Sequence, residues 1–128
     1  MQHWSHQFVG QPYVPRENDC AALAAKVQRE IFGRDIRLPT ERALHGRGFA
    51  EQIDRLKADY ACLVVAPQEG DAVLMICKGR PSHIGIYCVI AGEPWVLHAV
   101  RNAGQVVLTR LRELGANGLA IEAYYRWT

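Results

Sequence analysis

The sequence predicts an α+β protein in which N-terminal helices pack on an antiparallel sheet of about five to six strands. Two observations lead to this prediction. Apolar residues recur at helical spacing in the first part of the chain, and short apolar runs separated by turn residues follow from residue 61 onward. Helices that precede a series of consecutive strands favour a segregated layout over alternating β-α units. A length of 128 residues fits a single domain over residues 1–128.

The first helix is predicted over residues 20–32. Alanine and leucine favour helix in its first turns, and Asn18 or Asp19 can cap its start. Gly33 can end it. At 100° per residue, Cys20 falls on the apolar face of this helix, together with Leu23, Ala24, Val27 and Ile31. The cysteine therefore lies in the first turn, on the side that packs inward.

Weaker helical signals occupy residues 40–44 and 49–58, and the pattern then changes to strands. The predicted strands cover residues 61–66, 72–77, 83–90, 95–101, 105–111 and 120–126. Glycine-containing turns separate them, among them the turn around Gly92-Glu93.

Composition excludes several classes of function. Apolar residues make up 49% of the chain, which is too many for a disordered protein. A net charge of +2 with scattered arginines gives no reason to expect a nucleic-acid partner. No apolar run approaches the ~18 residues of a membrane span, so membrane insertion is not expected. The N-terminus lacks the basic and apolar regions of a signal peptide, so we expect synthesis in the cytoplasm and export by another route, such as lysis or a virion.

Four cysteines without a C-x-x-C pair give no sign of a disulfide framework or a zinc ribbon. Cys62, Cys77 and Cys88 lie in apolar runs and are predicted to be small buried hydrophobic residues. Cys20 differs, because it opens a helix. Unpaired N–H groups at a helix start favour a thiolate and can also hold an oxyanion, so this position suits a nucleophile. A packing cysteine is the alternative.

A nucleophilic cysteine needs a base, and the base needs an orienting partner. His3 and His6 belong to a polar segment that we expect to be solvated, and His45 to a surface loop. His83 opens a predicted strand, and His98 lies among apolar residues in the next one. Buried histidines must be hydrogen-bonded, so an imidazole pair is plausible; a satisfied core histidine is the alternative for His98.

Strand register complicates this pairing. A two-residue turn at Gly92-Glu93 would place His98 opposite Tyr87, leaving His83 roughly 13 Å away at ~3.3 Å per residue. Contact between the imidazoles then requires a longer asymmetric turn, a bulge or strong twist.

Four segments follow one another in a characteristic order. They are Asp19-Cys20 at a helix start, Gly70-Asp71-Ala72-Val73 at a strand start, His83-Ile84-Gly85-Ile86-Tyr87 and Val96-Leu97-His98-Ala99. This order resembles the NlpC-type family of papain-like cysteine peptidases, which act on bacterial cell-wall peptides. The resemblance covers about residues 10–99, and its most specific part is the strand of His83 followed fifteen residues later by His98.

The resemblance implies a papain-like fold with Cys20 as nucleophile, His83 as general base and acid, and His98 as the residue that orients His83. It makes Tyr13, Asp19 and Ser82 candidates for substrate binding. The implied substrate is the peptidoglycan stem peptide, cleaved between D-γ-glutamate and the diamino acid through a thioester. No metal or organic cofactor is implied.

The C-terminal part, from Gly104 on, resembles compact single-domain versions encoded with phage and prophage tail genes. This implies other tail proteins as partners and action in the periplasm or cell wall. Two features depart from the family: Ala21 follows the cysteine where a serine or another polar or aromatic residue is usual, and no signal peptide is present.

Three other functions remain open from the sequence. Cys20, His83 and His98 could be zinc ligands with an open fourth position, although no short ligand pair is present. The chain could be a non-catalytic structural module of a phage tail on the same fold. It could also carry out other acyl chemistry, such as deamidation of a protein or transfer of a lipid acyl group.

Overall fold

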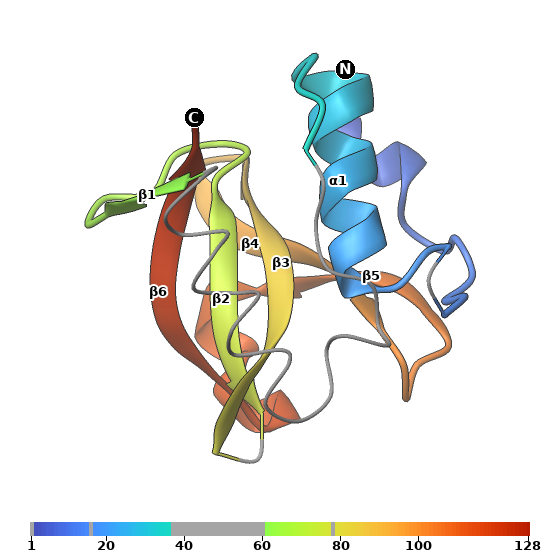
Figure 1. The fold of residues 1–128 in the computed structure, drawn as a ribbon. Helices are drawn as coiled ribbons and strands as arrows, with labels where there is room; N and C mark the ends of the chain where they lie inside the picture. The colour runs from blue at the N-terminus through green and yellow to red at the C-terminus, as the bar shows by residue number, and fades with distance from the viewer. Residues whose placement is uncertain (1, 16, 37–60, 78) are drawn as a thin grey trace.

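One α-helix and a six-stranded antiparallel sheet make up the regular structure of the described residues (Figure 1). The computed structural model describes residues 2–15, 17–36, 61–77 and 79–128. The prediction of an α+β protein with an antiparallel sheet of about five to six strands is confirmed. The helical signals at 40–44 and 49–58, and His45 between them, lie outside the described residues.

The helix α1 spans Cys20–Ile31, close to the predicted range. Asp19 is its N-cap, and its side chain accepts a hydrogen bond from the Ala22 N–H at 2.8 Å. Phe32 is the C-cap, and Gly33 follows with φ +70°, a conformation that favours glycine. A short 3-10 turn, η1 (Trp4–Gln7), precedes the helix.

The strands follow in chain order, and their spatial order is β1-β6-β2-β3-β4-β5. Their bounds are β1 Ala61–Val64, β2 Ala72–Cys77, β3 Arg80–Ile90, β4 Glu93–Val100, β5 Gln105–Arg110 and β6 Leu119–Trp127. The last strand therefore inserts between the first two, which no local turn signal indicates. The sheet twists strongly, so that β5 runs across the direction of β6 (Figure 1).

Two side-chain contacts hold the turn and the residue that precede β2. Gln28 of α1 donates its side-chain N–H to the Gly70 carbonyl at 2.9 Å, which joins the helix to the turn before β2. Arg126 of β6 holds the buried Asp71 carboxylate with two hydrogen bonds, of 3.1 and 2.9 Å. A side chain at Gly70 would meet the Phe32 ring at 2.6 Å, so this turn requires glycine for space as well as for its positive φ.

The sheet buries apolar side chains on both faces. On one face α1 packs over the alternating residues Ile84, Ile86 and Cys88 of β3 together with Leu97 and Ala99 of β4. The other face carries a smaller cluster whose members include Val73, Met75, Val96 and Leu114. Two 3-10 turns adjoin this second cluster, η3 (Leu111–Glu113) and η4 (Gly115–Asn117).

The cysteines differ in burial. Cys88 is fully buried as predicted, Cys77 is partly buried, and Cys62 is exposed, so the prediction for Cys62 is wrong. The reason is that Cys62 lies in β1, an edge strand that pairs only with β6 and whose middle residues face solvent. All four cysteines are free.

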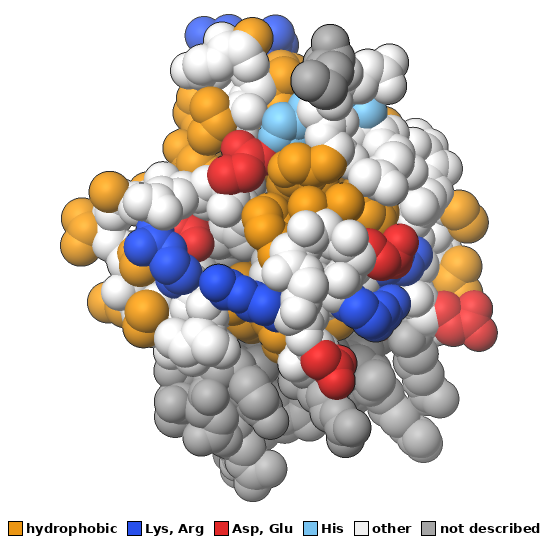
Figure 2. Space-filling view, turned by 90° about the horizontal axis from the view of Figure 1, so that it is seen from above, with side chains coloured by type: hydrophobic (Ala, Val, Ile, Leu, Met, Phe, Trp, Pro, Cys, Tyr) orange, Lys and Arg blue, Asp and Glu red, His pale blue; other side chains and the backbone are white. Residues whose placement is uncertain are grey.

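Seen from above, hydrophobic side chains gather in the middle of the surface, with basic, acidic and histidine side chains around them (Figure 2). Within the described ranges, no helix has the length and apolar character needed to cross a membrane.

Candidate active site

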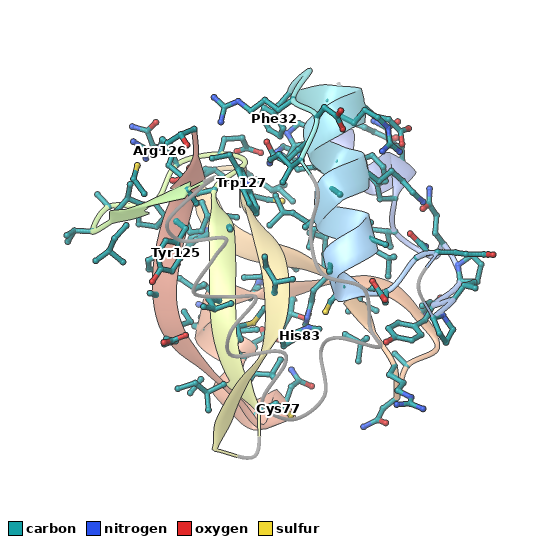
Figure 3. The ribbon with its side chains drawn as sticks, viewed as in Figure 1. Phe32, Cys77, His83, Tyr125, Arg126 and Trp127 are labelled. Carbon is teal, nitrogen blue, oxygen red and sulfur yellow. The ribbon has the colours of Figure 1, made fainter. Side chains whose placement is uncertain are left out.

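Two imidazoles and a hydroxyl form a continuous hydrogen-bonded row across three strands. His83 Nε2 on β3 (Figure 3) lies 2.8 Å from His98 Nδ1 on β4. His98 Nε2 lies 2.9 Å from Thr109 Oγ1 on β5. His98 is 2% exposed, while His83 is only partly buried. The predicted imidazole pair is therefore present, with a third member that the sequence analysis did not identify.

The turn between β3 and β4 explains how the two rings meet. Ile90 pairs with Glu93, so the turn residues are Ala91 and Gly92, with φ of 52° and 76°. This turn lies one residue before the two-residue turn considered at Gly92-Glu93, and the difference changes the pairing by two residues. His98 now falls opposite Gly85, the next position after the Ile86–Leu97 pair. Its ring has to bridge two residues along β3 to reach His83, instead of the four expected.

Glycine at position 85 is required by the close approach of β4. A Cβ built there would lie 2.5 Å from Val96 Cγ1 and 3.0 Å from Met75 Cε. Any larger residue would force the Val96 and Met75 side chains to shift. Next to His83, the register between β2 and β3 also shifts, because Met75 pairs with His83 but Ile76 pairs with Pro81. Such bulges redirect neighbouring side chains.

Thr109 reaches His98 because of the register between β4 and β5. His98 pairs with Val107, and Thr109 pairs with Val96, so Thr109 is the diagonal neighbour of His98 on the same face. Diagonal neighbours in a sheet lie within reach of long or aromatic side chains. Once the strand order and register are known, this contact follows; one threonine in a predicted strand gives no signal by itself.

Cys20 lies in the first turn of α1 and is 5% exposed. Burial raises the pKa of its thiol to about 12, and the Asp19 carboxylate adds to the rise. The backbone N–H groups of Ile84, Ala21 and Cys20 itself act in the opposite direction. N–H groups at the helix start therefore lower the thiol pKa, as expected. The expectation that the thiol pKa is lowered overall is wrong, because burial raises it by more.

Burial also keeps both imidazoles neutral. It lowers the pKa of His83 to about 4. Burial, with a further contribution from His83, lowers the pKa of His98 to about 3. Near neutral pH the resting site consists of a thiol and two neutral rings, so a charged thiolate–imidazolium pair is not its resting state.

The thiol and the imidazole row meet through β3. Cys20 and Ile84, the residue after His83, belong to the same core cluster, and the Ile84 N–H lowers the pKa of the thiol, so the Cys20 side chain packs near β3. The thiol makes no hydrogen bond to either ring. Within the described part of the chain, His83 Nδ1 has no hydrogen-bond partner, so this nitrogen remains available as a base.

The three candidates for substrate binding have different surroundings. Asp19 is fully buried and caps α1, so its carboxylate already has a structural use. Tyr13 is partly buried and packs against the same core cluster as Cys20. Ser82 belongs to β3, but its side chain is outside the part of the chain that the structure describes.

The arrangement of the rings disfavours zinc coordination by Cys20, His83 and His98. Both ring nitrogens of His98 are engaged, one with His83 and one with Thr109. His98 could bind a metal only by giving up one of these bonds. Cys20, His83 and His98 also offer no set of ligand atoms within 4.8 Å of one another.

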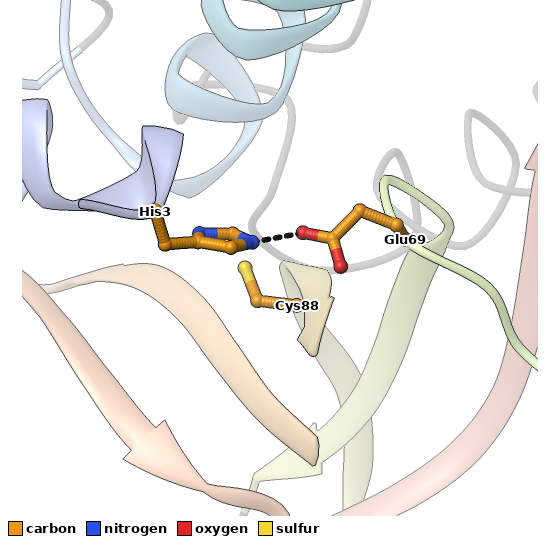
Figure 4. A group of neighbouring side chains, drawn as sticks. All are labelled: His3, Glu69 and Cys88. Carbon is orange, nitrogen blue, oxygen red and sulfur yellow. Dashed lines mark hydrogen bonds and ion pairs between the residues drawn. The ribbon is translucent and has the colours of Figure 1, made fainter. Parts of the chain in front are cut away.

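Another group of potential ligand atoms does lie within 4.8 Å: His3, Glu69 and Cys88 (Figure 4). Nδ1 of His3 accepts from the Ser5 N–H at 3.1 Å, so the neutral ring carries its proton on Nε2 and donates it to Glu69. Glu69 also accepts from the Val89 N–H at 2.8 Å. Burial raises the pKa of Cys88, so its thiol is protonated.

This group, as the structure has it, is a satisfied hydrogen-bond cluster that ties the N-terminal segment to the sheet. The prediction that His3 is simply solvated is therefore wrong, whereas His6 is exposed as expected. A metal could use these three residues only after the Cys88 thiol had lost its proton and the His3 ring had given up its hydrogen bond to Glu69.

Comparison with protein-family models, with curated proteins and with solved structures finds no match for this chain.

Proposed function

We propose that this chain is a cysteine peptidase of the NlpC type, with a papain-like fold, that hydrolyses an amide bond in peptidoglycan stem peptides. One observation carries the proposal. Among the described residues, the row of His83, His98 and Thr109 leaves one imidazole nitrogen, His83 Nδ1, without a hydrogen bond, and the residue after His83 packs in the same core cluster as the thiol at the start of α1. A nucleophile, a base and an orienting group are the parts that acyl transfer requires.

Acylation begins from the neutral state that burial imposes on the thiol and the rings. The Cys20 thiol moves from the Ile84 N–H to within reach of His83 and gives its proton to Nδ1 as the sulfur attacks the amide carbonyl. The carbonyl π electrons move to oxygen. Backbone N–H groups at the start of α1 then stabilise this oxyanion, worth about 3 kcal/mol per donor. Catalytic hydrogen bonds that are long in a free enzyme commonly tighten when substrate binds.

Collapse of the tetrahedral intermediate breaks the C–N bond. His83, now an imidazolium, gives the Nδ1 proton to the leaving amine, and the acyl group remains on Cys20 as a thioester. Water then attacks the thioester while His83 takes its proton, and the thiol is regenerated as the acid product leaves. His98 accepts the Nε2–H of His83 throughout, which holds the ring and stabilises its cation.

The substrate and setting come from the resemblance of the sequence segments around these residues. This resemblance implies that the cleaved bond joins D-γ-glutamate to the diamino acid of the stem peptide. The same resemblance favours a phage tail or virion as the carrier, with action in the periplasm or cell wall.

The test is hydrolysis of defined muropeptides, followed by mass spectrometry of the products. The proposal predicts that the purified chain cleaves them and that Cys20→Ala abolishes cleavage while the variant stays folded. Cys62→Ala is the matched control, because Cys62 is an exposed cysteine on the edge strand β1, and this variant should cleave like the parent. Equal cleavage by Cys20→Ala would contradict the assignment of the nucleophile.

A non-catalytic structural module of a phage tail is the second candidate. The burial of Cys20 and the raised pKa of its thiol favour it, because both make the free thiol a poor nucleophile at neutral pH. The same muropeptide experiment separates the two candidates. A folded parent that cleaves no stem peptide would support the structural module.

A further inference from the structure

The hydroxyl of Thr109 occupies the end of the imidazole row that is farthest from His83. Its Oγ1 lies 2.9 Å from His98 Nε2, while the other nitrogen of the same ring contacts His83. We propose that Thr109 is a positioning residue that accepts the Nε2–H of His98 and so holds this ring in the tautomer whose Nδ1 can accept a hydrogen bond from the Nε2–H of His83. The choice of tautomer and its kinetic consequence both rest on the proposed function, because the need for a basic His83 Nδ1 selects the direction of the hydrogen bonds.

Counting protons allows two directions for the hydrogen bonds of the row, and only one of them leaves His83 Nδ1 able to act as a base. A neutral imidazole has one N–H and one acceptor nitrogen. If His98 donates Nε2–H to Thr109, its Nδ1 must accept, and His83 must donate from its own Nε2. The lone pair of His83 is then on Nδ1, the nitrogen that a base needs here.

The opposite direction disables the base. If Thr109 donated to His98 Nε2, the proton of His98 would be on Nδ1 and would point at His83. The neutral His83 would then carry its proton on Nδ1 and could not take the proton of the thiol. One hydroxyl at the end of the row therefore decides which nitrogen of His83 is basic.

The same tautomer of His98 also suits the charged intermediate. An imidazolium at His83 has protons on both nitrogens, so His98 Nδ1 must again accept. His98 thus keeps one proton arrangement through acylation and deacylation, and a fixed acceptor at Thr109 Oγ1 maintains it without reorganisation. Shape alone does not require a hydroxyl here, because valine has nearly the same volume as threonine and could pair with Val96 in its place.

Two variants separate the hydroxyl from the shape of the side chain. Thr109→Val removes the hydroxyl and keeps the volume, and Thr109→Ser restores a hydroxyl. Thr109→Ala gives a second variant without a hydroxyl, should the valine variant fail to fold. The exposed Thr128→Val change at the C-terminus is the control for handling and concentration.

The first readout is the imidazole ¹⁵N chemical shifts of His98 in the free protein. We expect the Nε2–H tautomer in the parent and in Thr109→Ser, and a shift toward the Nδ1–H tautomer in Thr109→Val. The second readout is muropeptide hydrolysis, in which Thr109→Val should lower kcat at least tenfold with little change in KM, and Thr109→Ser should recover most of it.

An unchanged His98 tautomer in Thr109→Val overturns the inference, and so does an altered tautomer with the kcat of the parent. If the parent itself cleaves no muropeptide, the proposed function fails, and the ¹⁵N shifts alone decide whether Thr109 sets the tautomer.

Discussion

His83 Nε2 lies 2.8 Å from His98 Nδ1, although fifteen residues and a turn separate the two histidines in the chain. The contact uses Nε2 of His83, so Nδ1 is the nitrogen that would take the proton of the thiol. The two histidines also differ, since His98 uses both of its nitrogens in hydrogen bonds, whereas within the described ranges His83 uses one.

This inequality predicts how the two histidines rank in catalysis. His83→Gln should lower kcat by about 10²–10⁴-fold, the usual contribution of a general acid–base group. His98→Gln should lower it less, because His98 transfers no proton to substrate and glutamine keeps a polar group in place. Rates of muropeptide cleavage under saturating substrate measure both effects. A larger loss in His98→Gln would show that the two roles are reversed.

Gly85→Ala should damage the imidazole pair without touching either ring. The added methyl would lie 2.5 Å from Val96 Cγ1, so the Val96 side chain must shift on the strand that carries His98. We expect a loss of about 1–3 kcal/mol in the free energy of unfolding, typical of overpacking, and a fall in kcat. Urea denaturation and cleavage rates measure the two effects.

Gly115→Ala is the control for Gly85→Ala, because no atom lies within 4 Å of its added Cβ and its φ is not positive. If both substitutions have the same small effect, the close approach of β3 and β4 at Gly85 does not constrain the site.

The stability of the fold should fall as the pH drops below about 6.5. Burial, together with His83, lowers the pKa of His98 from 6.5 to about 3. Between these values the unfolded chain binds a proton that the folded chain does not, so the free energy of unfolding increases with pH. From pH 7 to pH 5 the loss should be roughly 2 kcal/mol for a buried histidine of this kind.

Urea denaturation of the parent and of His98→Gln at pH 7, 6 and 5 measures this slope. The variant should lose less stability over the range than the parent, whereas His6→Gln, at an exposed histidine, should match the parent. Identical slopes in the parent and in His98→Gln would contradict the neutral, buried state of His98.

Local patterns in the sequence were enough to predict most of the elements. The helix from Cys20 and the strand Ala72–Cys77 match their predicted ranges closely, because capping residues and short apolar runs determine them. The insertion of β6 between β1 and β2 depends on pairing between distant segments, which local periodicity does not encode. The exposure of Cys62 follows from that pairing, so its surroundings could not be predicted either.

The spacing of the imidazole pair depends on the turn at Ala91 and Gly92, which residue preferences do not indicate. Ala91 adopts a positive φ of 52°, which is unfavourable for alanine, so glycine and the following residue were the better candidates for the turn. The contact of His98 with Thr109 needs the register of β4 and β5 as well. The sequence could therefore suggest which histidines interact, but it could not give their spacing or the group beyond them.

Mass spectrometry of the acid-quenched reaction tests the central claim most directly. A muropeptide mixed with the chain and quenched within one turnover should leave an adduct with the mass of the acyl fragment. Peptide mapping should place this adduct on the segment that contains Cys20, and Cys20→Ser should carry no thioester. The account would be contradicted if the chain cleaved the muropeptide completely without an acyl fragment ever being found on Cys20, and if Cys20→Ser cleaved it at the same rate.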